Sequence, residues 1–142
     1  MWLGREQELK ALKQIASSDR AEFLLLYGRR RVGKSELIDQ FLKSQPGVRL
    51  LSREEAEALQ LRQGSAVLAE HFHDGLLKTN PFTEWDAFFS YLADKAAERV
   101  VIALDEFPYL VEANRSLPSL LQYHWDQKLR KTKILVVSRN RT

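Results

Sequence analysis

Short apolar runs alternate along the chain with longer segments in which apolar residues recur at the spacing of a helix. A short run that is apolar at nearly every position is typical of a strand buried on both faces of a parallel sheet. We expect such strands at residues 22–27 (EFLLLY), 99–105 (RVVIALD) and 133–138 (KILVVS), with a weaker candidate at 47–51 (GVRLL).

Between these strands, apolar residues three and four positions apart predict amphipathic helices. They are expected within residues 5–16, 34–44, 83–98 and 117–131. In the third of these segments, Thr83 follows the helix-blocking Pro81 and can act as the N-cap, with Asp86 at position N3. Pro118 suits the first turn of the last helix.

The region 53–80 also has a helical pattern, which Gly64 and Gly75 are expected to break. Strands that alternate with helices predict an α/β, doubly wound sheet. A chain of 142 residues without an internal repeat or a low-complexity linker is expected to form one domain.

Composition narrows the class of protein only moderately. With 44% hydrophobic and 29% charged residues, the chain has the make-up of a globular protein rather than a disordered one. Its net charge of +3 permits a nucleic-acid partner without arguing for one. Cysteine is absent, which excludes disulfides and zinc–thiolate sites. We see neither a signal peptide nor an apolar run long enough to span a membrane, so we expect a cytoplasmic location with no membrane partner.

The segment after the first strand matches the phosphate-binding pattern G-x-x-x-x-G-K-[ST]. Gly28, Gly33, Lys34 and Ser35 supply its defining positions. A chance match in a chain of this length has a probability on the order of one in a few hundred. The position between an apolar strand and an amphipathic helix also fits the pattern. The rest of the predicted nucleotide cradle consists of Arg29, Arg30, Arg31, Val32 and Glu36.

The chemistry of a triphosphate explains these residue types. Backbone N–H groups must point at the phosphates, and side chains at Gly28 and Gly33 would obstruct so close a loop. Lys34 is expected to place its charge on the β and γ oxygens, and the Ser35 hydroxyl to coordinate Mg²⁺. The three arginines could steer the triphosphate or touch nucleic acid, but we favour solvated loop charges.

A second candidate for the site is the pair Asp105–Glu106 at the carboxyl end of an apolar strand, where ligands bind in open α/β sheets. Asp105 is expected to hold Mg²⁺ through water. Glu106 is expected to point the other way on an extended backbone and to polarise the attacking water, as the catalytic carboxylate. The alternative is an acidic pair that caps the next helix, because Pro108 indicates a turn there.

A catalytic glutamate at this position implies one more strand between the phosphate-binding strand and the acidic strand, and 133–138 can supply it. The predicted sheet order is then 47–51, 99–105, 133–138, 22–27. A polar residue at the end of the inserted strand can orient the attacking water, and Ser138 and Asn140 are the candidates.

With these motifs in place, the chain resembles the archaeal-type ATPase family, a group of P-loop NTPases near the AAA+ and STAND branches. The stretches that carry the resemblance are LGREQEL (3–9), YGRRRVGKSELI (27–38), LDEFPYLVEAN (104–114) and LPSLLQYHWDQKL (117–129). The resemblance implies a three-layer P-loop NTPase fold of the additional-strand type, with ATP and Mg²⁺ as ligands. It also implies an adenine pocket built partly from Gly4, Arg5 and Glu6.

The chain departs from the family pattern after the strand at 133–138. Members usually carry Gly-Ser-Ser there, whereas this chain has Ser138-Arg139-Asn140-Arg141 and then Thr142. We therefore expect residues 1–142 to be a truncated ATPase domain without the fifth strand, the helical lid and the C-terminal domain. Strand 22–27 would be an unprotected sheet edge that pairs with another copy or with a downstream domain.

The sequence therefore predicts ATP binding with Mg²⁺-dependent hydrolysis that acts as a conformational switch. The alternative is a non-hydrolysing nucleotide-binding or assembly fragment of a larger ATPase. Two further patterns favour structural interpretations. His71, His73 and Asp74 could suggest a metal site, but His71 and His73 are two positions apart and would not share a helix face. The aromatic residues of 85–91 have the spacing of core positions rather than of a base-stacking platform.

Overall fold

The computed structural model of the protein describes residues 5–28 and 34–141. Four strands form one parallel sheet in the order β1-β4-β3-β2. This is the order predicted from the sequence, with β4 inserted between β1 and β3. The strands are β1 (Glu22–Gly28), β2 (Gly47–Leu51), β3 (Val100–Asp105) and β4 (Ile134–Arg141).

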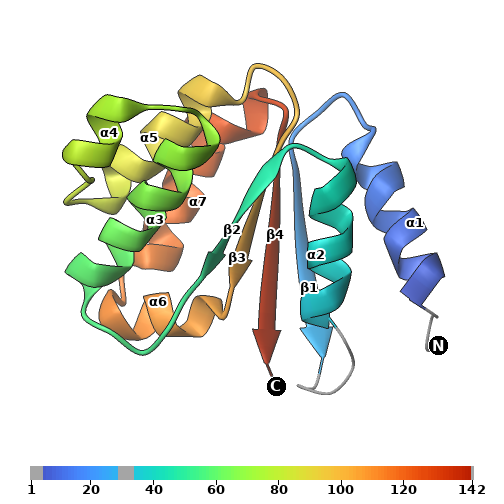
Figure 1. Ribbon diagram of the computed structural model, residues 1–142, viewed down its shortest axis with the longest axis horizontal. Coiled ribbons are helices and arrows are strands. Elements are labelled where there is room, and N and C mark those ends of the chain that lie inside the picture. Colours follow the sequence, from blue (N-terminus) through green and yellow to red (C-terminus); the bar gives the residue numbers. More distant parts are fainter. Residues whose placement is uncertain (1–4, 29–33, 142) are drawn as a thin grey trace.

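Helices connect the strands and cover both faces of the sheet, which gives three layers (Figure 1). The first two, α1 and α2, pack on one face, and the remaining helices lie on the other. The helices are α1 (Arg5–Ala16), α2 (Lys34–Ser44), α3 (Glu57–His71), α4 (Gly75–Thr79), α5 (Trp85–Lys95), α6 (Phe107–Ala113) and α7 (Leu117–Gln127), and a 3-10 turn spans Leu129–Lys131.

The central strand β3 explains why its sequence is apolar throughout. All six of its residues are buried, because helices cover both of its faces. Val101 and Ala103 belong to the core under α1 and α2, whereas Ile102 and Leu104 belong to the core under the other helices. Alternation along the strand therefore places Asp105 on the face covered by α2.

Strand β1 has β4 as its one neighbour within the described residues. Phe23 and Leu25 are 42% and 46% exposed on this edge strand. The ring of Phe23 meets the edge of Trp125 from α7, with the ring centroids 5.8 Å apart. The predicted sheet edge at this strand is therefore present in the described part of the chain.

Two local predictions were wrong at the start of α5. Glu84, with φ −140° and ψ 145°, occupies the N-cap position that was expected for Thr83, and its side chain makes no capping hydrogen bond. Asp86 does not complete a capping box. Its carboxylate instead lies 2.7 Å from Nε2 of the buried His124 on α7, so tertiary contact decides its partner.

The expected break at Gly64 was also wrong, because α3 runs through it. A Cβ atom at this position would lie 2.9 Å from Cε2 of Phe88, so the glycine permits close approach of α3 and α5. Gly75, in contrast, begins the new helix α4. Helix α3 therefore continues unbroken from Glu57 to His71, and the break in the helical segment falls between α3 and α4.

The aromatic residues of α5 lie in the core, as their spacing predicted. Trp85, Phe88 and Phe89 are each no more than 3% exposed. Phe88 makes edge-to-face contact with Trp85 and with Phe89, at centroid distances of 4.9 and 5.7 Å. These rings pack α5 against α3 and α7 and do not form an exposed base-stacking platform.

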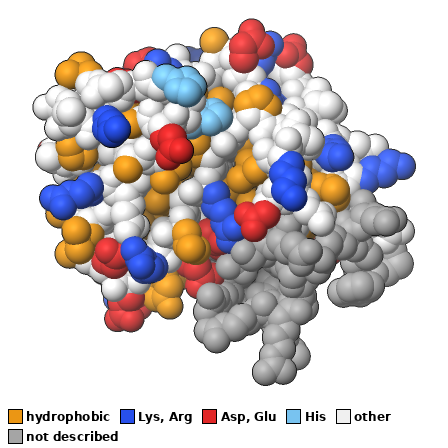
Figure 2. All heavy atoms as spheres, viewed as in Figure 1, with side chains coloured by type: hydrophobic (Ala, Val, Ile, Leu, Met, Phe, Trp, Pro, Cys, Tyr) orange, Lys and Arg blue, Asp and Glu red, His pale blue; other side chains and the backbone are white. Residues whose placement is uncertain are grey.

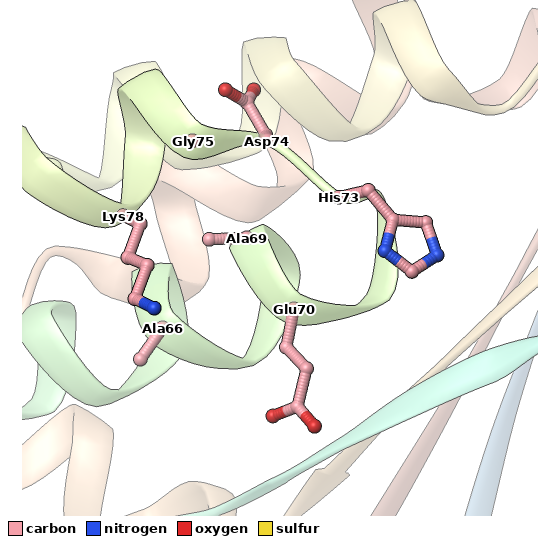
Figure 3. Close-up of a pocket in the computed structure, with 7 residues that line it drawn as sticks. All are labelled: Ala66, Ala69, Glu70, His73, Asp74, Gly75 and Lys78. Carbon is pink, nitrogen blue, oxygen red and sulfur yellow. The ribbon is translucent and has the colours of Figure 1, made fainter.

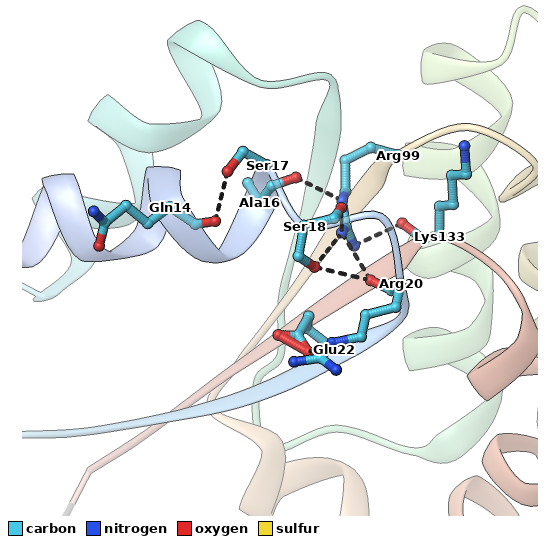
Figure 4. Close-up of polar contacts among 8 residues, drawn as sticks. All are labelled: Gln14, Ala16, Ser17, Ser18, Arg20, Glu22, Arg99 and Lys133. Atoms are coloured by element: carbon cyan, nitrogen blue, oxygen red, sulfur yellow. Dashed lines mark hydrogen bonds and ion pairs between the residues drawn. The ribbon is translucent and has the colours of Figure 1, made fainter.

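Arg99, the residue before β3, joins the chain segments at the amino ends of the strands (Figure 4). Its guanidinium donates to the carbonyl oxygens of Ala16, Ser18, Arg20 and Lys133 and to the Ser18 hydroxyl. Burial lowers the pKa of Arg99, and the charges of Glu22 and Asp19 oppose this effect. One side chain thus ties the end of α1 to the starts of β1 and β4.

Within the described ranges, no helix is both long and apolar enough to cross a membrane.

Candidate functional site at the carboxyl ends of the strands

The strands all run in the same direction, so their carboxyl ends meet at one edge of the sheet (Figure 1). Gly28 ends β1 at this edge, and Lys34 begins α2. Lys34, Ser35 and Glu36 form the first turn of α2, where the backbone N–H groups and the helix dipole favour an anion.

Several predicted binding residues lie outside the described part of the chain. These are Gly4, Arg29, Arg30, Arg31, Val32 and Gly33. Arg5 is the first residue of α1. Their proposed contacts with the phosphates and the adenine stay predictions.

Asp105 is the last residue of β3 and is fully buried. Its carboxylate is paired with Arg49, which lies in the middle of the neighbouring strand β2. Arg49 Nε donates to Asp105 Oδ2 at 3.1 Å, and Nη2 donates to the same oxygen. The carboxylate expected to meet Mg²⁺ therefore has a guanidinium beside it.

Arg49 also reaches α2, where Nη1 donates to Asp39 Oδ1 at 2.5 Å. Burial by itself lowers the pKa of Arg49, but the hydrogen bonds and charges of Asp105 and Asp39 outweigh it and hold this pKa above its ordinary value. Sequence reasoning missed this residue. The available signal was a lone charge inside the apolar run GVRLL, which a buried position tolerates only with a carboxylate partner.

Glu106 does not have the extended backbone that was expected for it. Its φ of 62° and ψ of 45° place it in the left-handed region, at the N-cap position of α6. Its side chain makes no capping hydrogen bond, and the residue is only 5% exposed. Glu106 therefore occupies the N-cap position, as the alternative of an acidic pair before a helix expected, but its side chain does not cap the helix. A glutamate in this conformation carries strain on the order of 1–3 kcal/mol, and such residues concentrate at functional sites.

The two candidates for orienting water both lie within β4, which continues to Arg141 rather than ending at residue 138. Ser138 is 2% exposed and lies between Leu104 of β3 and Leu25 of β1. Because Asp105 pairs with Arg139, alternation places Ser138 on the opposite face of the sheet from Asp105. Asn140 lies two residues further along, paired with Tyr27 of β1.

A hollow lies between α3 and α4, around two of the residues considered above as metal ligands, His73 and Asp74. It is lined by Ala66, Ala69, Glu70, His73, Asp74, Gly75 and Lys78. In Figure 3 the side chains of Glu70, His73 and Asp74 point away from one another. Among the described residues, no group of three or more His, Cys, Asp and Glu side chains is placed to hold a metal ion.

Asp74 instead has a structural role in this region. Its carboxylate accepts hydrogen bonds from the Leu77 N–H at 3.1 Å and from the Tyr91 hydroxyl at 2.8 Å. These bonds lower the pKa of Asp74. Burial, together with the bond to Asp74, raises the pKa of Tyr91 to about 12. Asp74 thus caps α4 and ties it to α5.

Charge on the viewed face of the molecule is mixed. Figure 2 shows basic and acidic side chains interspersed over the described part of this face, without a continuous basic stripe. A nucleic-acid interface requires such a stripe or patch, so this face offers no argument for one.

Comparison with known proteins points to one family. Residues 2–139 match the model of an ATPase domain found predominantly in Archaea. An uncharacterised protein of Methanocaldococcus jannaschii is 34% identical over 142 residues, which cover 96% of this chain and 29% of that protein. A shorter match, 43% identical over 44 residues, is to an uncharacterised ATP-binding protein of the same organism and covers 31% of this chain and 75% of that protein.

Solved structures show the same fold. A Walker-type ATPase of Pyrococcus abyssi superimposes with a TM-score of 0.68 at 21% identity, over 98% of this chain and 45% of that one. The ORC2 protein of Aeropyrum pernix, solved with nucleotides, gives 0.66 at 15% identity, over 98% and 41%. The chain thus spans less than half of these two structures and about three-tenths of the longer Methanocaldococcus relative. The expected P-loop NTPase fold is confirmed.

Proposed function

Because the chain belongs to the family of ATPase domains found predominantly in Archaea, we propose that it binds ATP with Mg²⁺ and hydrolyses it as a conformational switch. The proposed site lies at the carboxyl ends of β1 and β3, against the first turn of α2. Family membership supports nucleotide binding as the general activity. The more specific proposal of Mg²⁺-dependent hydrolysis depends on Lys34, Asp105 and Glu106.

The observation that carries the proposal is the placement of β4 between β1 and β3. This order puts the Asp105–Glu106 pair one strand away from the strand that leads into the phosphate-binding motif. In this proposal, the γ-phosphate and the attacking water lie between the acidic pair and the first turn of α2. Glu106 adds support, because it is a buried carboxylate held in a strained backbone conformation at this edge.

The residues present fit a magnesium–nucleotide complex. Mg²⁺ prefers oxygen ligands and is usually bound through one or two carboxylates together with substrate phosphates and water. The Asp105 carboxylate at the end of β3 is such a donor, and the Ser35 hydroxyl in the first turn of α2 would be a second. When bound, the ion neutralises charge on the phosphates and holds them in place.

Each protein group has a defined task in this proposal. Lys34 places a positive charge on the β and γ oxygens, where negative charge gathers as the γ-phosphate leaves. The N-terminal turn of α2 donates backbone N–H groups to the same phosphates. Glu106 accepts a hydrogen bond from the attacking water and orients it in line with the bond that breaks.

Replacing Lys34 with alanine tests nucleotide binding. Hydrogen bonds to charged groups are worth about 1.5–3 kcal/mol, so we expect the affinity for a fluorescent ATP analogue to fall by about tenfold or more. Lys43, in the last turn of α2, provides the matched control, because it carries the same charge at the far end of the same helix. Unchanged affinity in Lys34→Ala, or an equal loss in Lys43→Ala, would contradict the proposed site.

Replacing Glu106 with glutamine separates hydrolysis from binding. A general base or water-positioning carboxylate contributes about 10²–10⁴-fold to the rate, so phosphate release should fall by that factor while ATP affinity stays within about threefold. Glu112, on the following helix α6, is the control carboxylate for Glu→Gln substitution. If the unaltered domain binds ATP tightly but releases no phosphate above background, the non-hydrolysing alternative replaces this part of the proposal.

A further inference from the structure

The carboxylate proposed to meet Mg²⁺ is already paired with a cation of the same chain. Arg49 donates through both Nε and Nη2 to Oδ2 of Asp105. The Asp105 side chain is 0% exposed and the Arg49 side chain is 19% exposed, so solvent screens the pair only weakly. A guanidinium in this position offsets the negative charge that would attract a second cation.

Arg49 has another carboxylate partner within reach on α2. Nη1 donates to Asp39, whose side chain is 58% exposed. The guanidinium therefore bridges a buried carboxylate at the end of β3 and an exposed one on the helix that begins with Lys34. A small movement toward Asp39 would keep Arg49 paired while releasing Asp105.

We propose that Arg49 competes with Mg²⁺ for Asp105 and so sets the magnesium concentration at which the domain binds nucleotide. This inference rests on the proposed function and concerns the regulation of the same site. Two cations that share one carboxylate repel each other, and the repulsion is strong where water is excluded. Arg49 moves toward Asp39 as the magnesium–nucleotide complex arrives, and it returns to Asp105 when the complex leaves.

The opposite role for Arg49 would be to prop Asp105 in the geometry that Mg²⁺ needs. The two roles differ in sign. Removing a guanidinium that supports Asp105 would weaken magnesium binding, whereas removing a guanidinium that competes for Asp105 would strengthen it. The shared contact with Asp39 favours competition, because it provides a second position for the guanidinium that a fixed prop would not need.

The test measures equilibrium binding of a fluorescent ATP analogue as a function of free Mg²⁺. Coupling between contacting charged residues corresponds to about twofold to 150-fold in an equilibrium constant. For Arg49→Gln we expect the magnesium midpoint to fall by about threefold or more. For Asp39→Asn we expect it to rise by about twofold or more, because Arg49 then has less to draw it away from Asp105.

Two controls separate the contact from general electrostatics. Arg53→Gln removes the same charge four residues away, where Arg53 Nε pairs with Glu55 Oε1 at 3.0 Å, and its midpoint should stay within about twofold. If Asp39 acts through Arg49, the double variant Arg49→Gln/Asp39→Asn should behave like Arg49→Gln alone. Circular dichroism verifies that each variant is folded.

The outcomes are distinguishable. A midpoint that is unchanged or raised in Arg49→Gln, or lowered in Asp39→Asn, overturns the competition. If Arg49→Gln does not fold, Asp39→Asn still decides the matter, because competition requires a raised midpoint there. Absence of nucleotide binding by the unaltered domain at any Mg²⁺ concentration overturns the proposed function itself. Magnesium-dependent binding that none of the substitutions alters overturns only the inference about Arg49.

Discussion

Replacing Phe88 with alanine is expected to lower the free energy of unfolding by about 3–5 kcal/mol. Phe88 is 1% exposed and lies where α5 meets α3. Gly64 on α3 brings that helix close to the Phe88 ring, and Trp85 packs against it from the same helix. Truncation would leave a cavity that the backbone of α3 cannot fill, because position 64 has no side chain to move into it.

The measurement is urea unfolding followed by circular dichroism, with free energies from linear extrapolation. Domains of this kind have total stabilities of about 5–15 kcal/mol, so the expected loss is a large fraction of the free energy of unfolding. Tyr123→Ala is the matched control, because Tyr123 is an aromatic residue of α7 that is 58% exposed. This substitution should lower the free energy of unfolding by only about 0.5 kcal/mol, as is usual at the surface. Equal effects in the two variants would contradict the packing described for α5.

Replacing Arg99 with methionine is expected to lower the free energy of unfolding by about 2–4 kcal/mol, although the change adds an apolar side chain. Methionine keeps the length of the side chain but donates no hydrogen bonds. The carbonyl groups of Ala16, Arg20 and Lys133, which accept at 2.7–2.8 Å, would lose a charged donor together. The loss is less than the sum of the separate bonds, because the side chain is only half-buried and water can replace part of the network.

Two further variants show whether the geometry of the guanidinium is what matters. Arg99→Lys keeps the charge, but an ammonium cannot reach carbonyls on three segments at once, so we expect roughly half of the loss. Lys133→Met removes a cation whose ion pair with the exposed Asp19 spans 3.0 Å, and because solvent screens this pair, the substitution should cost much less stability than Arg99→Met. A full rescue by lysine would show that charge alone, rather than the fork of donors, stabilises the junction.

Both substitutions lie away from the proposed nucleotide site. Arg99 is at the amino ends of the strands, and Gly28 and Asp105 are at the carboxyl ends. We therefore expect the nucleotide affinity of the folded fraction to be unchanged in each variant. The Phe88 and Arg99 variants should therefore lose stability without losing nucleotide affinity, whereas Lys34→Ala should lose nucleotide affinity.

The strand pattern was predictable because burial on both faces leaves a direct record in the sequence. Each of the apolar runs became a strand, and β3 is buried at every position. The sheet order also followed, since a catalytic carboxylate after the acidic strand implied an inserted strand. The apolar pattern did not predict where β4 ends. Arg139 and Asn140 are polar, and they extend the strand by pairing through their backbones.

The helix boundaries that failed were those decided by a neighbouring helix. Thr83 has the local chemistry of an N-cap, yet Glu84 takes that position and Asp86 turns to His124. Gly64 has the local chemistry of a helix breaker, yet the ring of Phe88 packs against it. In each case a contact between residues far apart in sequence outweighs a local preference worth about 1 kcal/mol.

The sequence by itself determined the class of fold, the strand order and the residue types of the proposed site. These follow from local features: apolar runs, helical spacing and the order of glycine, lysine, serine and carboxylates along the chain. Only the tertiary structure decided that Arg49 holds Asp105 and that Glu106 adopts a left-handed backbone. The reason is physical: a charge buried in one strand must find its partner on another element, and the sequence does not record which element lies beside it.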